Sequence, residues 1–280
     1  MNAAPDLAAP DFAAEAVTLS VSPRRVGRIL LAVVLTVAAV GTAADWIIYQ
    51  VAADPDDGLA TVARRFDLGH EPSLPAWYSS LALLACGALA GLIAAVVRRD
   101  RLWWGLLGLL FAALALDEAV MIHEMADGVM HEALDGGGVL YFTWVVPGLA
   151  FTAGVGALFA RFLWRLPATT RRRFLLAGGT FVLGAVGMEM VAGAVVDSHP
   201  TEAAGIASPA HIAVQTVEET LEMLGVLLFL IAELDFLAAA VGAITVRFTP
   251  CGPPGAQDAR RRRGSSPPVP QPHAEAGSAG

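Results

Sequence analysis

Acidic and histidine side chains stand inside segments of this chain that are otherwise apolar, and these are the residues that could do chemistry. Eight of them form the candidate site that we infer from the sequence: Asp117, Glu118, His123, Glu124, Glu189, Glu218, Glu219 and Glu222. A charged side chain at the centre of a membrane helix costs about 2.5–3.5 kcal/mol on insertion scales, so such residues usually mark functional sites. The chain has no lysine and no arginine deep inside these segments. Protons or a bound cation must therefore neutralise the acids.

Carboxylates together with neutral imidazoles are ligands for a divalent cation, whose charge offsets their mutual repulsion. The sequence lacks the Glu-x-x-His spacing of di-iron helix bundles, and it also lacks His-Glu-x-x-His, because Asp127 stands where the second histidine would be. We therefore expect a divalent metal ion, of unknown identity, held by the whole cluster and not by one local motif. The same residue types without a metal would form a proton relay.

The composition places these residues in a membrane. Of the 280 residues, 56% are hydrophobic and only 16% are charged, whereas soluble domains carry about a quarter charged residues. Six apolar runs are each long enough for a helix that crosses about 30 Å of hydrocarbon. We predict spans at 29–51, 77–97, 102–122, 139–163, 174–196 and 217–246.

Continuous apolar runs of this length exclude a transmembrane β-barrel, so the predicted fold class is an all-α bundle of six transmembrane helices. The bundle occupies residues 29–247, after a flexible N-terminal segment (1–28) and before a disordered tail (248–280) that is low in apolar residues. The first run resembles a cleavable signal peptide at its start, but it continues through Trp46 to Tyr49 and so makes a full span.

The arginines predict the orientation of the bundle. Of the 18 basic residues, 16 fall on one side of the predicted spans, and only Arg64 and Arg65 fall on the other. The positive-inside rule therefore places both termini in the cytoplasm. A sequence rich in alanine, glycine, leucine and arginine is typical of a high-GC bacterium, so we expect a bacterial inner membrane.

Helical geometry brings the acids together. At 100° per residue, His211, Gln215, Glu218 and Glu222 fall within roughly 60° of one another, with Glu219 on the flank. At 1.5 Å per residue, counted from the inner arginines, Asp45, Asp117 and Glu189 all lie about 24–25 Å up, near the outer face. If the third span continues as a helix past Gly128, then Asp117, Glu124, Asp127 and His131 also share one stripe.

Two sequence features predict how the helices pack. Glycines at close helical spacing allow backbones to approach each other in lipid; they are Gly87, Gly91, Gly105, Gly108, Gly178, Gly179, Gly184 and Gly187. Pro147-Gly148 falls inside the predicted fourth span, where we expect it to kink the helix. A purely structural role for the buried acids, as a hydrogen-bonded network that fixes helix packing, remains an open alternative.

The leading functional hypothesis is a metal site near the outer membrane face, in an enzyme that acts on a lipid-like substrate or in cation handling. The expected partners are the lipid bilayer and that substrate or cation, with no nucleic acid. The first alternative is a proton- or cation-coupled transporter or channel, with Glu233 and Asp235 as inner stations. The second is a sensor or assembly factor without turnover. The sequence does not decide among them or set the oligomeric state.

Overall fold

The computed structural model describes residues 21–52, 57–70, 72–123, 125, 130 and 136–241. Within these residues the chain is helical and contains no β-strand. The predicted disordered tail and most of the predicted flexible N-terminal segment lie outside the described residues.

Six helices in the described part of the chain are long and apolar enough to cross a membrane, which confirms the predicted number. In chain order they are α1 (Pro23–Trp46) with the π-helical turn η1 (Ile47–Val51), α3 (Leu74–Val96), α4 (Arg101–Val120), α6 (Val145–Arg165), a composite helix, and α10 (Pro209–Val241). The composite helix consists of α7 (Ala168–Val182), the π-turn η3 (Leu183–Met188) and α8 (Glu189–Asp197). The short elements α2 (Gly58–Ala63), η2 (Gly138–Leu140) and α9 (Glu202–Ile206) lie between spans.

The third span ends earlier than predicted. α4 stops at Val120 because Met121 adopts the left-handed conformation, with φ of 56°, and its N–H bonds back to the carbonyl of Asp117. α4 therefore does not carry the predicted stripe beyond Asp117. The other stripe residues, Glu124, Asp127 and His131, lie outside the described residues.

The fourth and sixth spans begin at other residues than predicted. α6 begins at Val145, so Pro147 lies in its first turn, where the missing N–H removes no intrahelical bond. The predicted kink at Pro147 is therefore wrong. α10 begins at Pro209, eight residues before the predicted start at position 217, because the Ser208 hydroxyl accepts the N–H of His211 and caps the helix.

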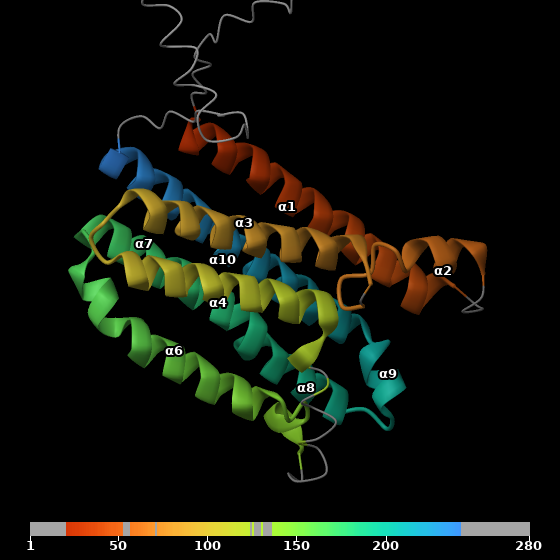
Figure 1. Ribbon diagram of the computed structural model, residues 1–280. Helices are drawn as coiled ribbons and strands as arrows, with labels where there is room; N and C mark the ends of the chain where they lie inside the picture. The colour runs from red at the N-terminus through yellow and green to blue at the C-terminus, as the bar shows by residue number, and fades with distance from the viewer. Residues whose placement is uncertain are drawn as a thin grey trace, which may run out of the picture. The chain divides into compact units, whose positions relative to one another are not determined.

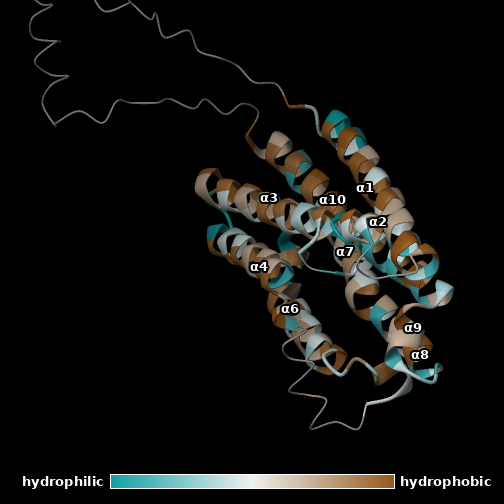
Figure 2. Ribbon diagram, turned by 90° about the vertical axis from the view of Figure 1, so that its right-hand side faces the viewer, coloured by the Kyte–Doolittle hydropathy of each residue, from teal (hydrophilic) through white to brown (hydrophobic). Residues whose placement is uncertain are grey.

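The spans form an arc with α10 at its centre. α10 packs against α1, α3, α7, η3 and α8, while α4 packs against α3 and α6 packs against α7 and η3. The order around the arc is thus α4, α3, α10, α7 and α6. α4 and α6 are its two free ends, and they diverge along their length (Figure 1). Apolar residues cover the spans along most of their length (Figure 2).

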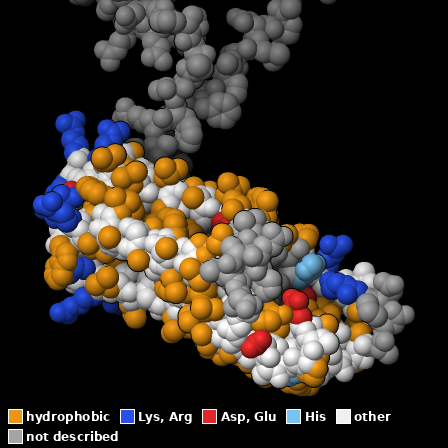
Figure 3. Space-filling model, turned by 90° about the horizontal axis from the view of Figure 1, so that it is seen from below, with side chains coloured by type: hydrophobic (Ala, Val, Ile, Leu, Met, Phe, Trp, Pro, Cys, Tyr) orange, Lys and Arg blue, Asp and Glu red, His pale blue; other side chains and the backbone are white. Residues whose placement is uncertain are grey.

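Aromatic side chains join the first turn of α4 to the last turns of α6. Buried Trp104 packs edge-to-face on Phe162 and Phe174, with ring centroids 5.3 and 5.9 Å apart. Asp100 at the start of α4 pairs with Arg165 at the end of α6, at 3.0 Å. This is also the arginine-rich end, and the space-filling view shows most of the basic side chains gathered there, with a smaller group at the opposite end (Figure 3).

Small residues let the helices approach closely at some of the predicted glycines. A methyl group added at Gly108 would lie 2.9 Å from the carbonyl oxygen of Gly87, so α3 and α4 are in backbone contact there. Gly184 makes a similar approach to α10. At Gly91 and Gly105 an added methyl group meets nothing within 4 Å, so at these two positions no neighbouring helix lies where the side chain would be.

This difference predicts opposite effects of two alanine substitutions on α4. Gly108→Ala should lower the free energy of unfolding by about 1–3 kcal/mol, because a rigid backbone oxygen occupies the space of the new methyl group. Gly105→Ala should leave stability unchanged or raise it, because alanine favours helix and the space is open. Thermal unfolding of both variants in the same detergent measures the difference, and equal melting temperatures would contradict the α3–α4 contact.

Candidate functional site

A cavity of about 1120 Å³ lies inside the arc, between α4, α6, α7 and α10. At one end it is lined by seven acids and two histidines: Asp117, Glu118, Glu189, Glu202, Glu218, Glu219, Glu222, His123 and His211. The rest of its wall is mainly leucine, phenylalanine, valine and glycine, and no arginine lines it among the described residues. The cavity is therefore amphipathic, with an acidic end and an apolar end.

The predicted face of α10 points into the acidic end. His211, Gln215, Glu218, Glu219 and Glu222 all line the cavity. The extension of α10 to Pro209 is what places His211 on the same helix as the acids. Glu218 is buried, with 9% of its surface exposed, and the other two acids are half-buried.

A close approach between two spans sets Glu189 beside this face. A methyl group at Gly184 would lie 2.9 Å from both the carbonyl oxygen of Glu218 and the Cγ atom of Glu222. Gly184 belongs to the π-turn η3, and Glu189 is the first residue of the helix that follows it. Turns of this kind recur at functional sites, because they re-aim the side chains that come after them. The glycine therefore lets η3 approach the backbone of α10 at the level of the acids.

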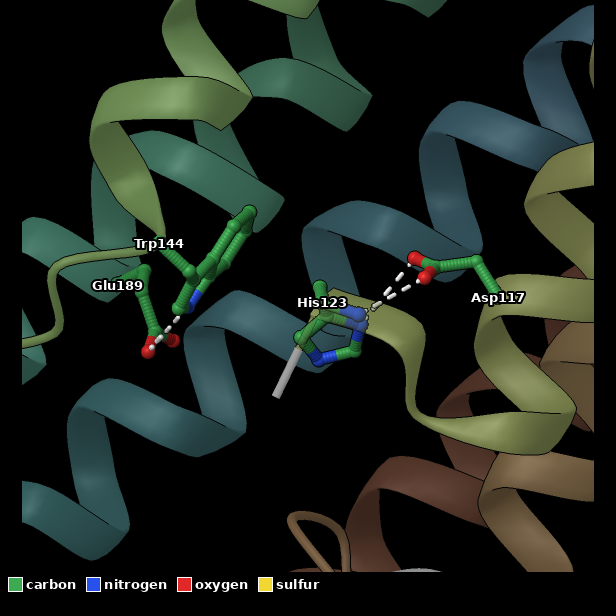
Figure 4. Close-up of polar contacts among 4 residues, drawn as sticks. All are labelled: Asp117, His123, Trp144 and Glu189. Atoms are coloured by element: carbon green, nitrogen blue, oxygen red, sulfur yellow. Dashed lines mark hydrogen bonds and ion pairs between the residues drawn. The ribbon is translucent and has the colours of Figure 1, made fainter. Parts of the chain in front are cut away.

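A second set of contacts joins α4, α6 and α8 (Figure 4). Asp117 accepts the backbone N–H of His123 at 3.0 Å and lies 3.1 Å from its Nδ1 atom. The indole N–H of Trp144 donates to Glu189 at 3.2 Å, and the His123 and Trp144 rings lie 5.1 Å apart. With its Nδ1 proton donated to Asp117, the imidazole has its lone pair on Nε2, which suits a base or a metal ligand.

The acids from the three helices are close enough to interact with one another. Glu218 is paired with Glu189 through their side chains, and Glu222 interacts electrostatically with Glu118, Glu189 and Asp117. The structure thus brings together every candidate residue that it describes, and Glu124 lies outside the described residues. Within the described part of the chain, no three His, Cys, Asp or Glu side chains are arranged as a metal site. The role of these residues as metal ligands stays a prediction.

The site also contains residues that the sequence did not single out. Trp144 lies near the outer end of its span, where an aromatic residue indicates an interface belt and not a partner for Glu189. Glu202 belongs to α9, a five-residue helix too short to predict from the sequence. For both residues, the contacts depend on the tertiary structure and leave no signal in the local sequence.

A loop between α2 and α3 contributes to the acidic end of the cavity, next to α1 and α10. Leu68 and Gly69 line the cavity, and a methyl group at Gly69 would overlap the side-chain amide of Gln215. Fully buried Asp45 accepts the N–H of Leu68 at 3.2 Å, and Asp67 accepts the N–H of Gly69 at 3.0 Å. The depth of Asp45 suggested its place at this level, but its partnership with the loop was not predicted.

Asp67 belongs to this loop and is itself buried, with 3% of its surface exposed. Burial raises the pKa of Asp67 above its ordinary value of 3.8, and the Gly69 amide, His70, a side-chain hydrogen bond with Asp45 and Arg64 offset only part of this rise. Ionising this carboxyl group therefore costs the folded protein free energy.

The two acids proposed as inner stations occupy different environments. Asp235 pairs with Arg173 of the same chain, so it is a surface ion pair at the arginine-rich end. Glu233 is fully buried, and among the described residues neither of its carboxyl oxygens has a hydrogen-bond partner. It stands eleven residues after Glu222, which is about 20° around α10 and about 16 Å further along it.

Comparison with known proteins assigns the chain to a family without assigning an activity. The family described as a domain of unknown function (DUF8692) matches residues 28–236, a range that contains all the candidate residues. No curated protein and no solved structure matches the chain.

The buried loop carboxyl group predicts a pH-dependent stability. Because the pKa of Asp67 is higher in the folded than in the unfolded chain, its stabilising contribution is complete below about 3.8 and is lost as the pH rises toward the folded pKa. Asp67→Asn should therefore melt higher than the parent at pH 7–8, by about 2–4 °C for each kcal/mol gained. The difference should shrink toward pH 4.

Asp197→Asn is the control for this measurement, because Asp197 is an exposed carboxylate that accepts the N–H of Gly138 away from the cavity. A melting temperature of Asp67→Asn that stays below that of the parent at pH 8 would contradict the destabilising role of the buried carboxyl group.

Proposed function

Since the chain belongs to the DUF8692 family, whose description names no activity, we propose its function from the side chains themselves. The protein is a multi-pass membrane protein that binds a divalent cation at the acidic end of the cavity. It uses this site as an enzyme that acts on a lipid-like substrate.

The observation that carries the proposal is the surplus of acids at one end of the cavity. Seven acidic side chains line it, and among the described residues no arginine does. Carboxylates inside a low-dielectric site repel one another unless protons or a cation neutralise them. A divalent cation removes two charges at once and is the partner that oxygen and imidazole ligands prefer.

The side chains divide into two groups by their contacts. Glu118, Glu189, Glu218 and Glu222 interact across three helices, so they are the proposed holders of the cation. His123 is oriented by Asp117 and is the proposed base that moves a proton at its Nε2 atom. A divalent cation bound beside them would supply Lewis-acid chemistry at this end of the cavity.

The proposed orientation places the site on the outer side of a bacterial inner membrane. The arginine-rich end is the end where α1 begins and α10 finishes, and the acids lie at the other end of the spans. The positive-inside rule then assigns the arginine-rich end, and both termini, to the cytoplasm.

A second candidate function rests on Glu233. A fully buried acid without a partner among the described residues, on nearly the same face of α10 as Glu222, suits an inner station of a proton or cation relay. In that reading the protein is a transporter or channel, and the acidic end of the cavity is its outer entrance.

The metal content of the purified protein tests the first proposal. The parent in detergent should hold a divalent metal in a near-stoichiometric amount by mass spectrometry. The double variant Glu118→Gln/Glu218→Gln should lose most of it, because both helices would then offer neutral amides. Asp197→Asn, which changes an outer carboxylate that does not line the cavity, should keep it. An equal metal content in all three proteins, or no metal in the parent, would contradict the proposed metal site.

Proteoliposomes separate the two candidate functions. If the cavity is an enzyme site, vesicles with the parent protein should show no proton or cation uptake beyond that of empty vesicles. Glu233→Gln should then leave the metal content unchanged. Uptake by the parent that Glu233→Gln abolishes would instead favour the relay. Asp235→Asn is the matched control on the same helix, because Asp235 is held by Arg173 at its end.

A further inference from the structure

The apolar part of the cavity is a feature that the acid site alone does not explain. Below the acids, its walls include Leu110 and Leu114 of α4, Phe151 and Val155 of α6, and Phe229 of α10. Along α6 the lining runs from Gly148 to Leu163, which is about 22 Å at 1.5 Å per residue. One leaflet of a bilayer is about 15 Å thick in its hydrocarbon region. The apolar wall is thus long enough to hold a lipid chain.

This apolar part has the form of a wedge that is closed at the arginine-rich end and open on one side. Trp104 with Phe162 and the pair Asp100–Arg165 join α4 to α6 at the closed end. Further along, α4 packs against α3 and α6 against α7 and η3, and the two helices diverge (Figure 1). Some side chains that line the cavity on these helices are also exposed, such as Phe151 with 53% of its surface, so the cavity is accessible from the side of the bundle.

Two glycines show that the wedge is space and not helix packing. Gly156 on α6 and Gly179 on α7 both line the cavity, and a methyl group added at either meets nothing within 4 Å. Gly154, on the same helix as Gly156, is also open, and all three glycines are exposed, but Gly154 does not line the cavity. Apolar walls offer water few hydrogen-bond partners, so hydrocarbon is the occupant that this space suits.

The acidic end of the cavity favours one kind of head group on the molecule that binds there. A divalent cation offsets the charge of only two of the seven acids that line the cavity, so further carboxyl groups remain beside it, whose oxygens accept hydrogen bonds and which a nearby cationic head would favour in the ionised form. An anionic phosphate head would meet like charge with no arginine on the described lining, whereas an ammonium head would meet opposite charge. Tyr49 and Trp144 also line this end and offer aromatic faces, which attract cations.

We propose that the wedge holds the hydrocarbon chain of a long-chain amine. The amine enters sideways from the bilayer between α4 and α6 and brings its ammonium head to the acidic end of the cavity. The proposal names the substrate class of the proposed function, on which it rests for the use of the site. The wedge itself is independent of whether a metal is bound.

Photolabelling of the full chain in lipid nanodiscs tests this inference. The probe is a long-chain amine with a photoreactive group in the middle of its chain, and the comparison probe is the phosphate with the same chain. We expect the amine to label α4, α6 and α7 in the parent, as mapped by mass spectrometry of the peptides. Gly156→Phe and Gly179→Phe fill the wedge from two different helices, and each should reduce labelling about tenfold, which corresponds to about 1.4 kcal/mol.

Gly154→Phe is the matched control, because it adds the same ring to α6 on the side that faces lipid, and it should label like the parent. Competition by unlabelled long-chain amine on the parent gives a readout that needs no variant to fold. Equal labelling of Gly154→Phe and Gly156→Phe, a failure of competition, or equal labelling by the phosphate probe would each overturn the proposal.

The same preparations separate this inference from the proposed metal site. If the purified parent contains no metal but its labelling still falls in Gly156→Phe and Gly179→Phe, the metal site is refuted and the inference is supported. Metal-loaded protein whose labelling does not depend on the wedge would overturn the inference and leave the metal site standing.

Discussion

The structure depends on one electrostatic constraint, which is that many acids and few basic groups line one end of a cavity among spans of a membrane protein. Seven acids line one end of the cavity, and no arginine of the described chain joins them. Most of the basic residues gather at the opposite end of the spans (Figure 3). Protons or a cation from outside the chain would offset the surplus of acids, and this is why we propose a binding site at the acidic end. Had an arginine stood among the acids, the same cluster would be explained as a structural ion-pair network.

The helix arrangement serves this constraint through a few small or capped positions. Gly184 lets the helix that carries Glu189 come into backbone contact with α10, so that acids from two spans meet. The Ser208 cap extends α10 beyond its apolar run and adds His211 to the same face. α6, by contrast, leaves α4 uncovered beyond the aromatic end, and this separation creates the space below the acids. The close approach of η3 to α10 brings the acids together at one end of the cavity, and the divergence of α4 from α6 makes the apolar space at the other.

Much of the fold was predictable from the sequence, because spanning helices need only length and apolarity. The same is true of the α10 face, since helical periodicity alone places Gln215, Glu218 and Glu222 together. The end of α4 was not predictable, because a methionine and not a glycine adopts the left-handed conformation at position 121. Whether Pro147 kinks its helix depends on where that helix starts. The sequence did not show this start, because apolar residues also precede Val145. Contacts such as that of Trp144 with Glu189 depend on tertiary distances that no local pattern encodes.

The division of the cavity into an acidic and an apolar end also favours a binding site over a transport pathway for protons or cations through the membrane. A relay must carry protons or ions from Glu222 to Glu233, a distance of about 16 Å along α10. Between them the helix presents Val226 and Phe229 to the cavity, and an apolar space of this kind does not hold the water chain that a proton would need. Beyond Phe229 the arc is closed by packed aromatic rings. The cavity thus has its acids at one end and packed aromatic rings at the other, which fits the proposed enzyme site better than the proposed relay.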